Sequence, residues 1–150
     1  MYNWLAMISL AVEIKEILEA EAREALAAGW AEVREEEAEI GLTLFLEPMK
    51  LAAAPLEVYF DSDQLLVCSP GRNDMVCEFF SEDPDEIKRQ VRALTRAVVD
   101  GGYAERVQEG TTEIVAEWSG PDGRQRATRS LLAMRRPNDD GWRRVDYEPY

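Results

Sequence analysis

Residues 81–102 read SEDPDEIKRQVRALTRAVVDGG, and this stretch carries the signals of a complete amphipathic helix. Asp83 is placed to cap the first turn with its side-chain oxygen. Pro84 follows at the first helical position, where no backbone N–H is needed. Glu86, three residues after Asp83, completes a variant of the capping box. The closing pair of glycines ends the helix, because glycine adopts the left-handed conformation typical of that position.

The apolar residues of this stretch recur every three or four positions, at Ile87, Val91, Leu94 and Val98. Such spacing places them on one stripe of a helix. Arginines occupy positions off that stripe. Segments with strand character precede and follow the stretch, so we expect a helix that covers a sheet.

The rest of the chain predicts one more helix and two series of strands. Tyr2 to about Gly29 keeps helical spacing, and beyond it the apolar period shortens toward two. The order predicts one α+β domain over residues 1–150, in which an N-terminal helix, an antiparallel meander, the central helix and a second antiparallel meander follow one another, with the helices packed on a curved sheet. Strands are expected over residues 30–36, 38–47, 56–60, 64–69 and 75–80, and again over 103–108, 111–118, 124–136 and 142–147.

The charge is strongly negative, with 30 acidic and 17 basic residues, a net charge of −13 and a pI near 4.4. Residues 1–50 carry 11 acidic and 4 basic side chains, and residues 101–150 carry 9 and 8. Such a charge repels nucleic acid and anionic membrane surfaces, and it attracts a basic protein partner. The alternative is that the acidic residues only keep the protein soluble.

The acidic residues expected to contact a basic partner lie in the first half of the chain. They form one dense run and a pair of aspartates near a turn. The alternative is a solvated strand end, since runs of charge usually face water. The residues are Glu35, Glu36, Glu37, Glu39, Asp61 and Asp63.

The chain has no histidine, which removes the commonest general base and the commonest metal ligand. No phosphate-binding loop, nucleophile elbow, metal-binding spacing or dinucleotide fingerprint occurs. We therefore expect no catalytic residue, no cofactor and no metal site, and a protein that is not an enzyme. A secretory signal and a transmembrane stretch are not evident, so we expect a cytoplasmic protein.

Cys68 and Cys77 flank a predicted turn at residues 70–74, so they would face each other across a hairpin. They are expected either to form a reducible cross-strand disulfide or to remain buried thiols. The segment Tyr2–Leu10 is apolar on more than one face, which indicates burial on several sides or a homodimer contact. Six aromatic residues are expected either to pack in the core or to line a pocket for an apolar ligand: Trp30, Tyr59, Phe60, Tyr103, Trp118 and Trp142.

Small, acidic α+β chains without a catalytic signature resemble bacterial immunity proteins and antitoxins, and also the small chaperones of secretion systems. The resemblance is one of size, charge and fold class, so no residue role is carried over from it. Together with the charge, it implies a non-catalytic module that binds and inhibits a basic protein. The alternatives are a domain that binds a small apolar ligand and a secretion-type chaperone that acts as a homodimer.

Overall fold

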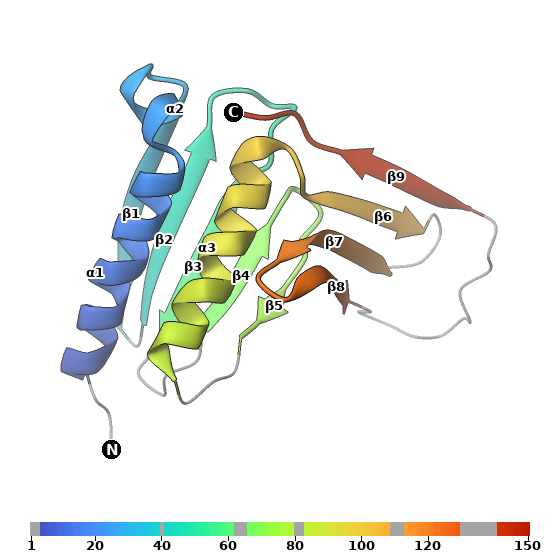
Figure 1. Ribbon diagram of the computed structural model, residues 1–150. Coiled ribbons are helices and arrows are strands. Elements are labelled where there is room, and N and C mark those ends of the chain that lie inside the picture. The colour runs from blue at the N-terminus through green and yellow to red at the C-terminus, as the bar shows by residue number, and fades with distance from the viewer. Residues whose placement is uncertain (1–3, 40, 62–65, 80–82, 109–112, 130–140) are drawn as a thin grey trace.

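The computed structural model describes residues 4–39, 41–61, 66–79, 83–108, 113–129 and 141–150. These residues form three helices and two antiparallel sheets (Figure 1). The α+β class and the order of helices and strands expected from the sequence are confirmed. The helices are α1 (Trp4–Glu21), α2 (Arg23–Ala27) and α3 (Pro84–Asp100).

The first sheet has five strands in the order β1-β2-β3-β4-β5, and the second has four in the order β8-β7-β6-β9. The strands of the first are β1 (Ala31–Ala38), β2 (Gly41–Pro48), β3 (Leu56–Asp61), β4 (Leu66–Pro70) and β5 (Cys77–Glu78). Those of the second are β6 (Ala104–Gln108), β7 (Ile114–Gly120), β8 (Gly123–Arg129) and β9 (Trp142–Asp146).

Helix α3 begins and ends where the sequence predicts. The Asp83 carboxylate accepts a hydrogen bond of 3.0 Å from the backbone N–H of Asp85, which satisfies one of the free donors of the first turn. Gly101 has a φ of 77° and closes the last turn in the left-handed conformation. All four residues of the predicted apolar stripe are buried.

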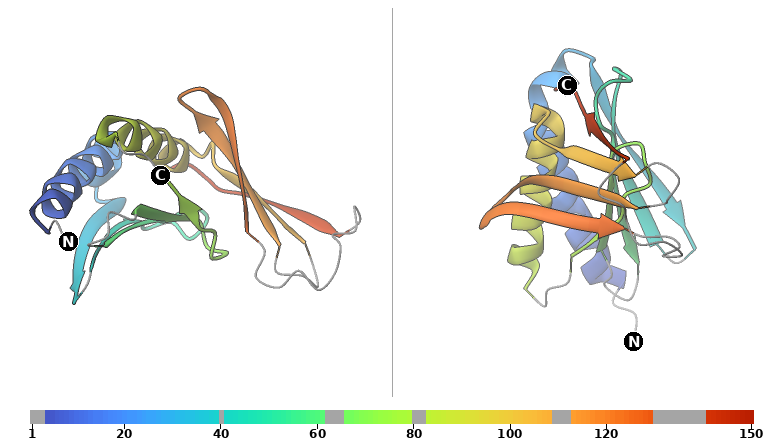
Figure 2. Two further views of the ribbon diagram at one scale, coloured as in Figure 1. Left: turned by 90° about the horizontal axis from the view of Figure 1, so that it is seen from below. Right: turned by 90° about the vertical axis from the view of Figure 1, so that its right-hand side faces the viewer.

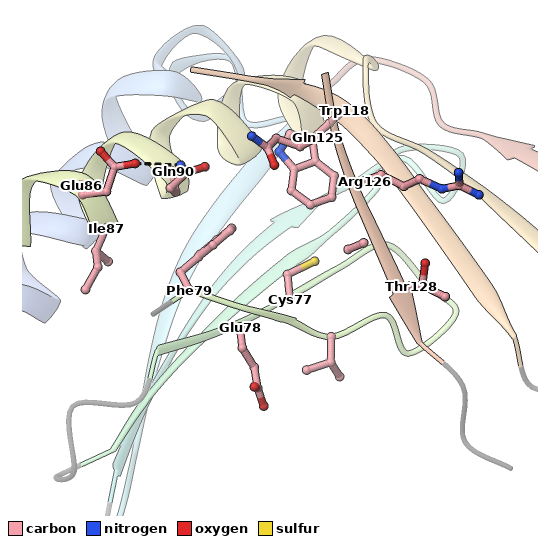
Figure 3. A pocket seen from close by; sticks show the side chains of 12 residues that line it. Cys77, Glu78, Phe79, Glu86, Ile87, Gln90, Trp118, Gln125, Arg126 and Thr128 are labelled. Atoms are coloured by element: carbon pink, nitrogen blue, oxygen red, sulfur yellow. Dashed lines mark hydrogen bonds between the residues drawn. The ribbon is translucent and has the colours of Figure 1, made fainter. Parts of the chain in front are cut away.

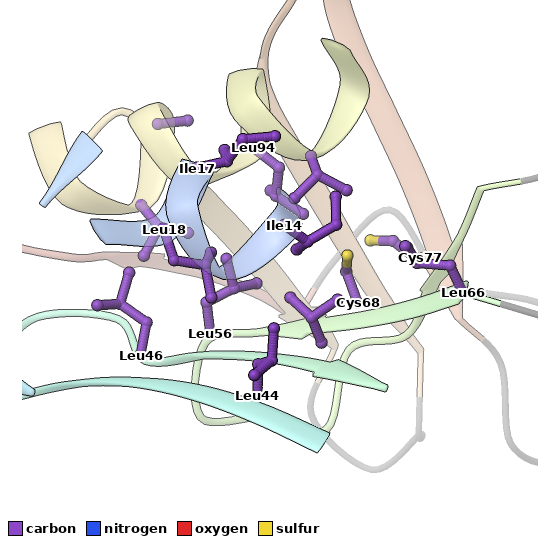
Figure 4. Close-up of a cluster of buried hydrophobic side chains, with 14 of the residues drawn as sticks. Ile14, Ile17, Leu18, Leu44, Leu46, Leu56, Leu66, Cys68, Cys77 and Leu94 are labelled. Atoms are coloured by element: carbon purple, nitrogen blue, oxygen red, sulfur yellow. The ribbon is translucent and has the colours of Figure 1, made fainter. Parts of the chain in front are cut away.

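Helices α1 and α3 lie side by side on one face of the five-stranded sheet, and no described element covers its other face, which we call the open face (Figure 2). The core fills the space between them (Figure 4). The alternation along β2 directs Leu44 and Leu46 toward the helices, where they meet Ile14, Leu18 and Leu94. The second sheet packs against α3 through β7.

Three features differ from the expected layout. The N-terminal helix is interrupted after Glu21, so that α2 forms a separate short helix. The strands divide between two sheets instead of one, and β9 pairs with β6 and not with β8. The expected strand over 124–136 is described as far as Arg129, and its remainder lies outside the described residues. Strand pairing depends on contacts between distant segments, which local periodicity does not encode.

Candidate functional site

A groove of about 540 Å³ lies between α1 and the hairpin formed by β1 and β2. Its apolar floor comes from Met7, Ala11 and Leu42, and its margins carry charged side chains from α1 and β1. The groove therefore combines an apolar surface with charges, as sites that bind proteins commonly do.

An exposed apolar stripe runs along α1 beside this groove. Leu5, Ile8 and Val12 are 79%, 41% and 53% exposed, and their spacing of three and four residues aligns them on one side of the helix. Ile8 and Val12 also line the groove. Because several neighbouring apolar side chains on a helix face are seldom left in water, the stripe is a candidate contact surface.

The carboxylates at the groove come from both elements. Glu35 and Glu37 lie on the face of β1 that is turned toward α1, and Lys15 of α1 forms an ion pair of 3.6 Å with Glu35. Glu16, Glu19 and Glu37 also line the groove, and none of these three forms an ion pair with another described residue. The groove therefore has an excess of negative charge that the described part of the chain does not neutralise.

Glu36 and Asp61 lie on the opposite, open face of the five-stranded sheet, because alternate residues of a strand point to opposite sides. Here Arg34 lies 4.4 Å from the centre of the Phe45 ring and pairs with Glu36 at 3.0 Å. It also contacts Glu32 at 3.8 Å and Glu47 at 2.5 Å. The open face is acidic as well, but its central carboxylates already share one arginine.

The acidic residues predicted as one patch are thus divided by the structure. Glu35 and Glu37 belong to the groove, Glu36 and Asp61 to the open sheet face, and Glu39 is exposed just beyond β1. Asp63 lies outside the described residues. The sequence marked Tyr2–Leu10, which contains Leu5 and Ile8, as a segment for burial or homodimer contact, but it did not assign Val12 or the acidic residues of α1 to a binding site.

A second cleft, of about 700 Å³, lies between β5, the first turns of α3 and the hairpin formed by β7 and β8 (Figure 3). Trp118 is 3% exposed at this cleft, and its Nε1 has no hydrogen-bond partner among the described residues. The other aromatic residues expected at a pocket do not join it. Phe60 and Tyr103 are buried in the core, while Trp30 is 59% exposed beside α2.

A buried polar cluster joins the two sheets. The Glu105 carboxyl is 1% exposed and accepts hydrogen bonds from the Tyr147 hydroxyl and, at 3.5 Å, from Asn73 Nδ2. The backbone N–H of Arg72 donates to the same Tyr147 hydroxyl at 2.9 Å. Burial raises the pKa of Glu105, and the hydrogen bonds to its carboxyl oppose that rise. Glu105 and Tyr147 are both buried, and their contacts hold the β4–β5 turn to the second sheet.

Cys68 and Cys77 are directly opposite each other on β4 and β5, and both are free, buried thiols. Burial raises the pKa of Cys77 to about 12, and it also raises the pKa of Cys68 well above its usual value. Neither thiol is therefore ionised at neutral pH, although Cys77 borders the second cleft.

No protein family, characterised protein or solved structure was found to match this chain. Among the described residues, no helix is long and apolar enough to cross a membrane. The same residues contain no group of three or more histidine, cysteine, aspartate and glutamate side chains arranged to hold a metal ion.

Proposed function

We propose that this protein is a non-catalytic module that binds a basic partner protein in the groove between α1 and β1. The observation that carries the proposal is the exposed stripe of Leu5, Ile8 and Val12 beside carboxylates that lack a cation. A partner segment with apolar side chains on one face and lysine or arginine beside them would fit both features. The apolar contacts would supply affinity, and the opposite charges would raise the association rate.

The open face of the five-stranded sheet is a less suitable binding site for a basic partner than the groove. Its carboxylates surround Arg34, so a partner would have to displace contacts that already exist. An immunity-type inhibitor of a basic toxin is one biological form of the proposed activity. Such an inhibitor acts by covering the active surface of the bound toxin, so it needs no catalytic residue of its own.

A second copy of the chain is the alternative occupant of the α1 stripe. Such a homodimer, through the region Tyr2–Leu10, would bury Leu5 and Ile8. It would also bring the carboxylates of two α1 helices together in a symmetric contact, where like charges repel. We therefore favour a basic partner over a second copy. Light scattering after size exclusion at micromolar concentration distinguishes them, because a monomer argues against the homodimer.

The decisive experiment compares three baits in affinity capture from the native cells at low salt. The baits are the wild-type chain, the groove variant Glu19→Gln/Glu37→Gln, and the control Glu24→Gln/Asp100→Asn, which removes the same charge from exposed positions outside the groove. We expect a basic protein that the wild type and the control retain, that moderate salt elutes, and that the groove variant loses. If the groove variant retains the same proteins as the control, the proposed site is wrong.

A further inference from the structure

The cleft between the two sheets is bordered by two strand edges with which no other described strand pairs. Strand β8 is the terminal strand of the four-stranded sheet, and β5 is the terminal strand of the five-stranded sheet. Four consecutive residues from each side line the cleft, 76–79 and 125–128 (Figure 3). An unpaired edge presents backbone donors and acceptors in a row, which is the feature that an added strand recognises.

The register identifies the free groups of β8. Gly120 and Gly123 pair next to the two-residue turn of the hairpin, and hydrogen-bonded and non-hydrogen-bonded pairs alternate from there. Residues 125 and 127 consequently bond to β7, whereas Arg126 and Thr128 direct their backbone N–H and C=O groups away from it. Within the part of the chain that the structure describes, no strand pairs with that edge of β8.

Side chains that line the cleft could contact the side chains of an added strand. Phe79, Ile87 and Trp118 form an apolar surface on which a large aliphatic or aromatic side chain can pack. The indole N–H of Trp118 is buried and has no hydrogen-bond acceptor among the described residues. Since a buried N–H without a partner is unfavourable, a carbonyl brought into the cleft would compensate a deficiency of the free protein.

Arg126 indicates the charge of the occupant. It stands opposite Glu117 in the register, but the Glu117 carboxylate already binds Arg106 at 2.7 Å and Arg124 at 2.8 Å. Arg126 itself is exposed and forms no ion pair with a described residue. An acidic side chain next to it on an added strand would form a cross-strand pair of opposite charges.

We propose that this cleft binds an extended peptide segment of a partner protein, which adds to the free edge of β8 as a further strand. Its inward side chains are apolar and contact Trp118, and an outward acidic side chain pairs with Arg126. The cleft and the groove of α1 share no lining residue, so the proposal goes beyond the function proposed for that groove. A volume of about 700 Å³ lies within the range of pockets that enclose ligands.

The test uses the full chain labelled with ¹⁵N and the synthetic peptide acetyl-Thr-Leu-Thr-Leu-Glu-Leu-Thr-amide, followed by NMR titration. Two analogues are N-methylated, one at every leucine and the other at the remaining residues. In an added strand, the backbone N–H groups of only one of these two sets of residues face β8. We therefore expect one analogue to bind like the parent peptide and the other to lose binding. The amide signals of Arg126 and Thr128 and the indole signal of Trp118 should shift with the parent peptide.

Two variants test the side-chain contacts. Trp118→Phe keeps an aromatic ring and removes the indole N–H, and we expect about fivefold weaker binding. Arg126→Gln should weaken binding about threefold, as for an exposed ion pair, and leave a peptide with glutamine in place of its glutamate unaffected. The absence of any shift at β8 or Trp118 with the parent peptide would overturn the proposal. Equal binding of both methylated analogues would show that side chains enter the cleft without strand pairing, and would also overturn it.

Discussion

The hydroxyl of Tyr147 donates a hydrogen bond to the buried carboxyl of Glu105, which lies 42 residues earlier in the chain. The same hydroxyl accepts a hydrogen bond from the backbone N–H of Arg72. Tyr147, which directly follows β9, therefore connects the β4–β5 turn to β6. This contact ties the two sheets together where their strands do not pair. It also places the ionisable carboxyl group of Glu105 in the interior, so the free energy of unfolding should depend on pH.

Glu105→Gln should stabilise the protein at neutral pH. Burial raises the pKa of Glu105 in the folded state, so its carboxylate form opposes folding, and this penalty grows as the pH rises from the unfolded pKa through the folded one. Glutamine is neutral at every pH and still offers an oxygen to Tyr147. The gain in the free energy of unfolding should therefore be largest at and above neutral pH and should shrink as the pH falls toward about 4.5.

Glu117→Gln is the control with the opposite sign. Hydrogen bonds from Arg124 and Arg106 lower the pKa of Glu117, so its carboxylate form favours folding. Its replacement should reduce stability above the unfolded pKa, and the difference should vanish as the pH falls through the lowered folded pKa. Urea unfolding of the three proteins at several pH values measures both trends. A pH-independent effect of Glu105→Gln would contradict the assigned cause.

The thiols of Cys68 and Cys77 should react slowly in the folded protein. Both are buried, and the pKa of Cys77 is raised to about 12 by that burial. Because the thiolate is the reactive form, labelling by a thiol reagent such as 5,5′-dithiobis(2-nitrobenzoic acid) at neutral pH should be slow in buffer and rapid in denaturing urea. Rapid labelling of two thiols in buffer would show that β5 opens readily.

Gly101→Ala should destabilise the protein more than Gly29→Ala does. Both glycines have a positive φ, 77° and 75°, so alanine adds backbone strain of about 1 kcal/mol at either position. At Gly29 nothing lies within 4 Å of the added Cβ, whereas at Gly101 it would meet the backbone nitrogen of Pro149 at 2.9 Å. We expect a total loss of about 2–3 kcal/mol for Gly101→Ala in urea unfolding. Equal losses of unfolding free energy in the two variants would mean that the residues around Pro149 move away at no cost in free energy.

Leu94→Ala should reduce the free energy of unfolding by about 3 kcal/mol, because Leu94 is fully buried between α3, α1 and the sheet. The matched control is Leu51→Ala. Leu51 is 84% exposed, so its truncation should change stability by less than about 0.5 kcal/mol. Similar losses for the two variants would contradict the described core.

Local sequence signals predicted α3 well, because each depends on residues close together in the chain. The cap at Asp83, the left-handed glycine at residue 101 and the spacing of the apolar stripe are properties of one segment. The alternation that predicted β2 is likewise local, and it places Leu44 and Leu46 in the core. Hence the fold class and the order of the elements followed from the sequence.

The candidate sites depend on contacts that no local pattern contains. The register of β1 decides that Glu35 and Glu37 border the groove while Glu36 lies on the other face. A glutamate in a short strand usually faces water, and Glu105 is buried because residues distant in the chain, such as Tyr147 and Asn73, pack against it. The sequence by itself determined which segments become helices and strands and that the chain is strongly acidic. Among the described residues, the tertiary structure decided which strands lie at the edges of the sheets, which carboxylates share a groove and which one is buried, because these follow from packing between segments distant in the chain.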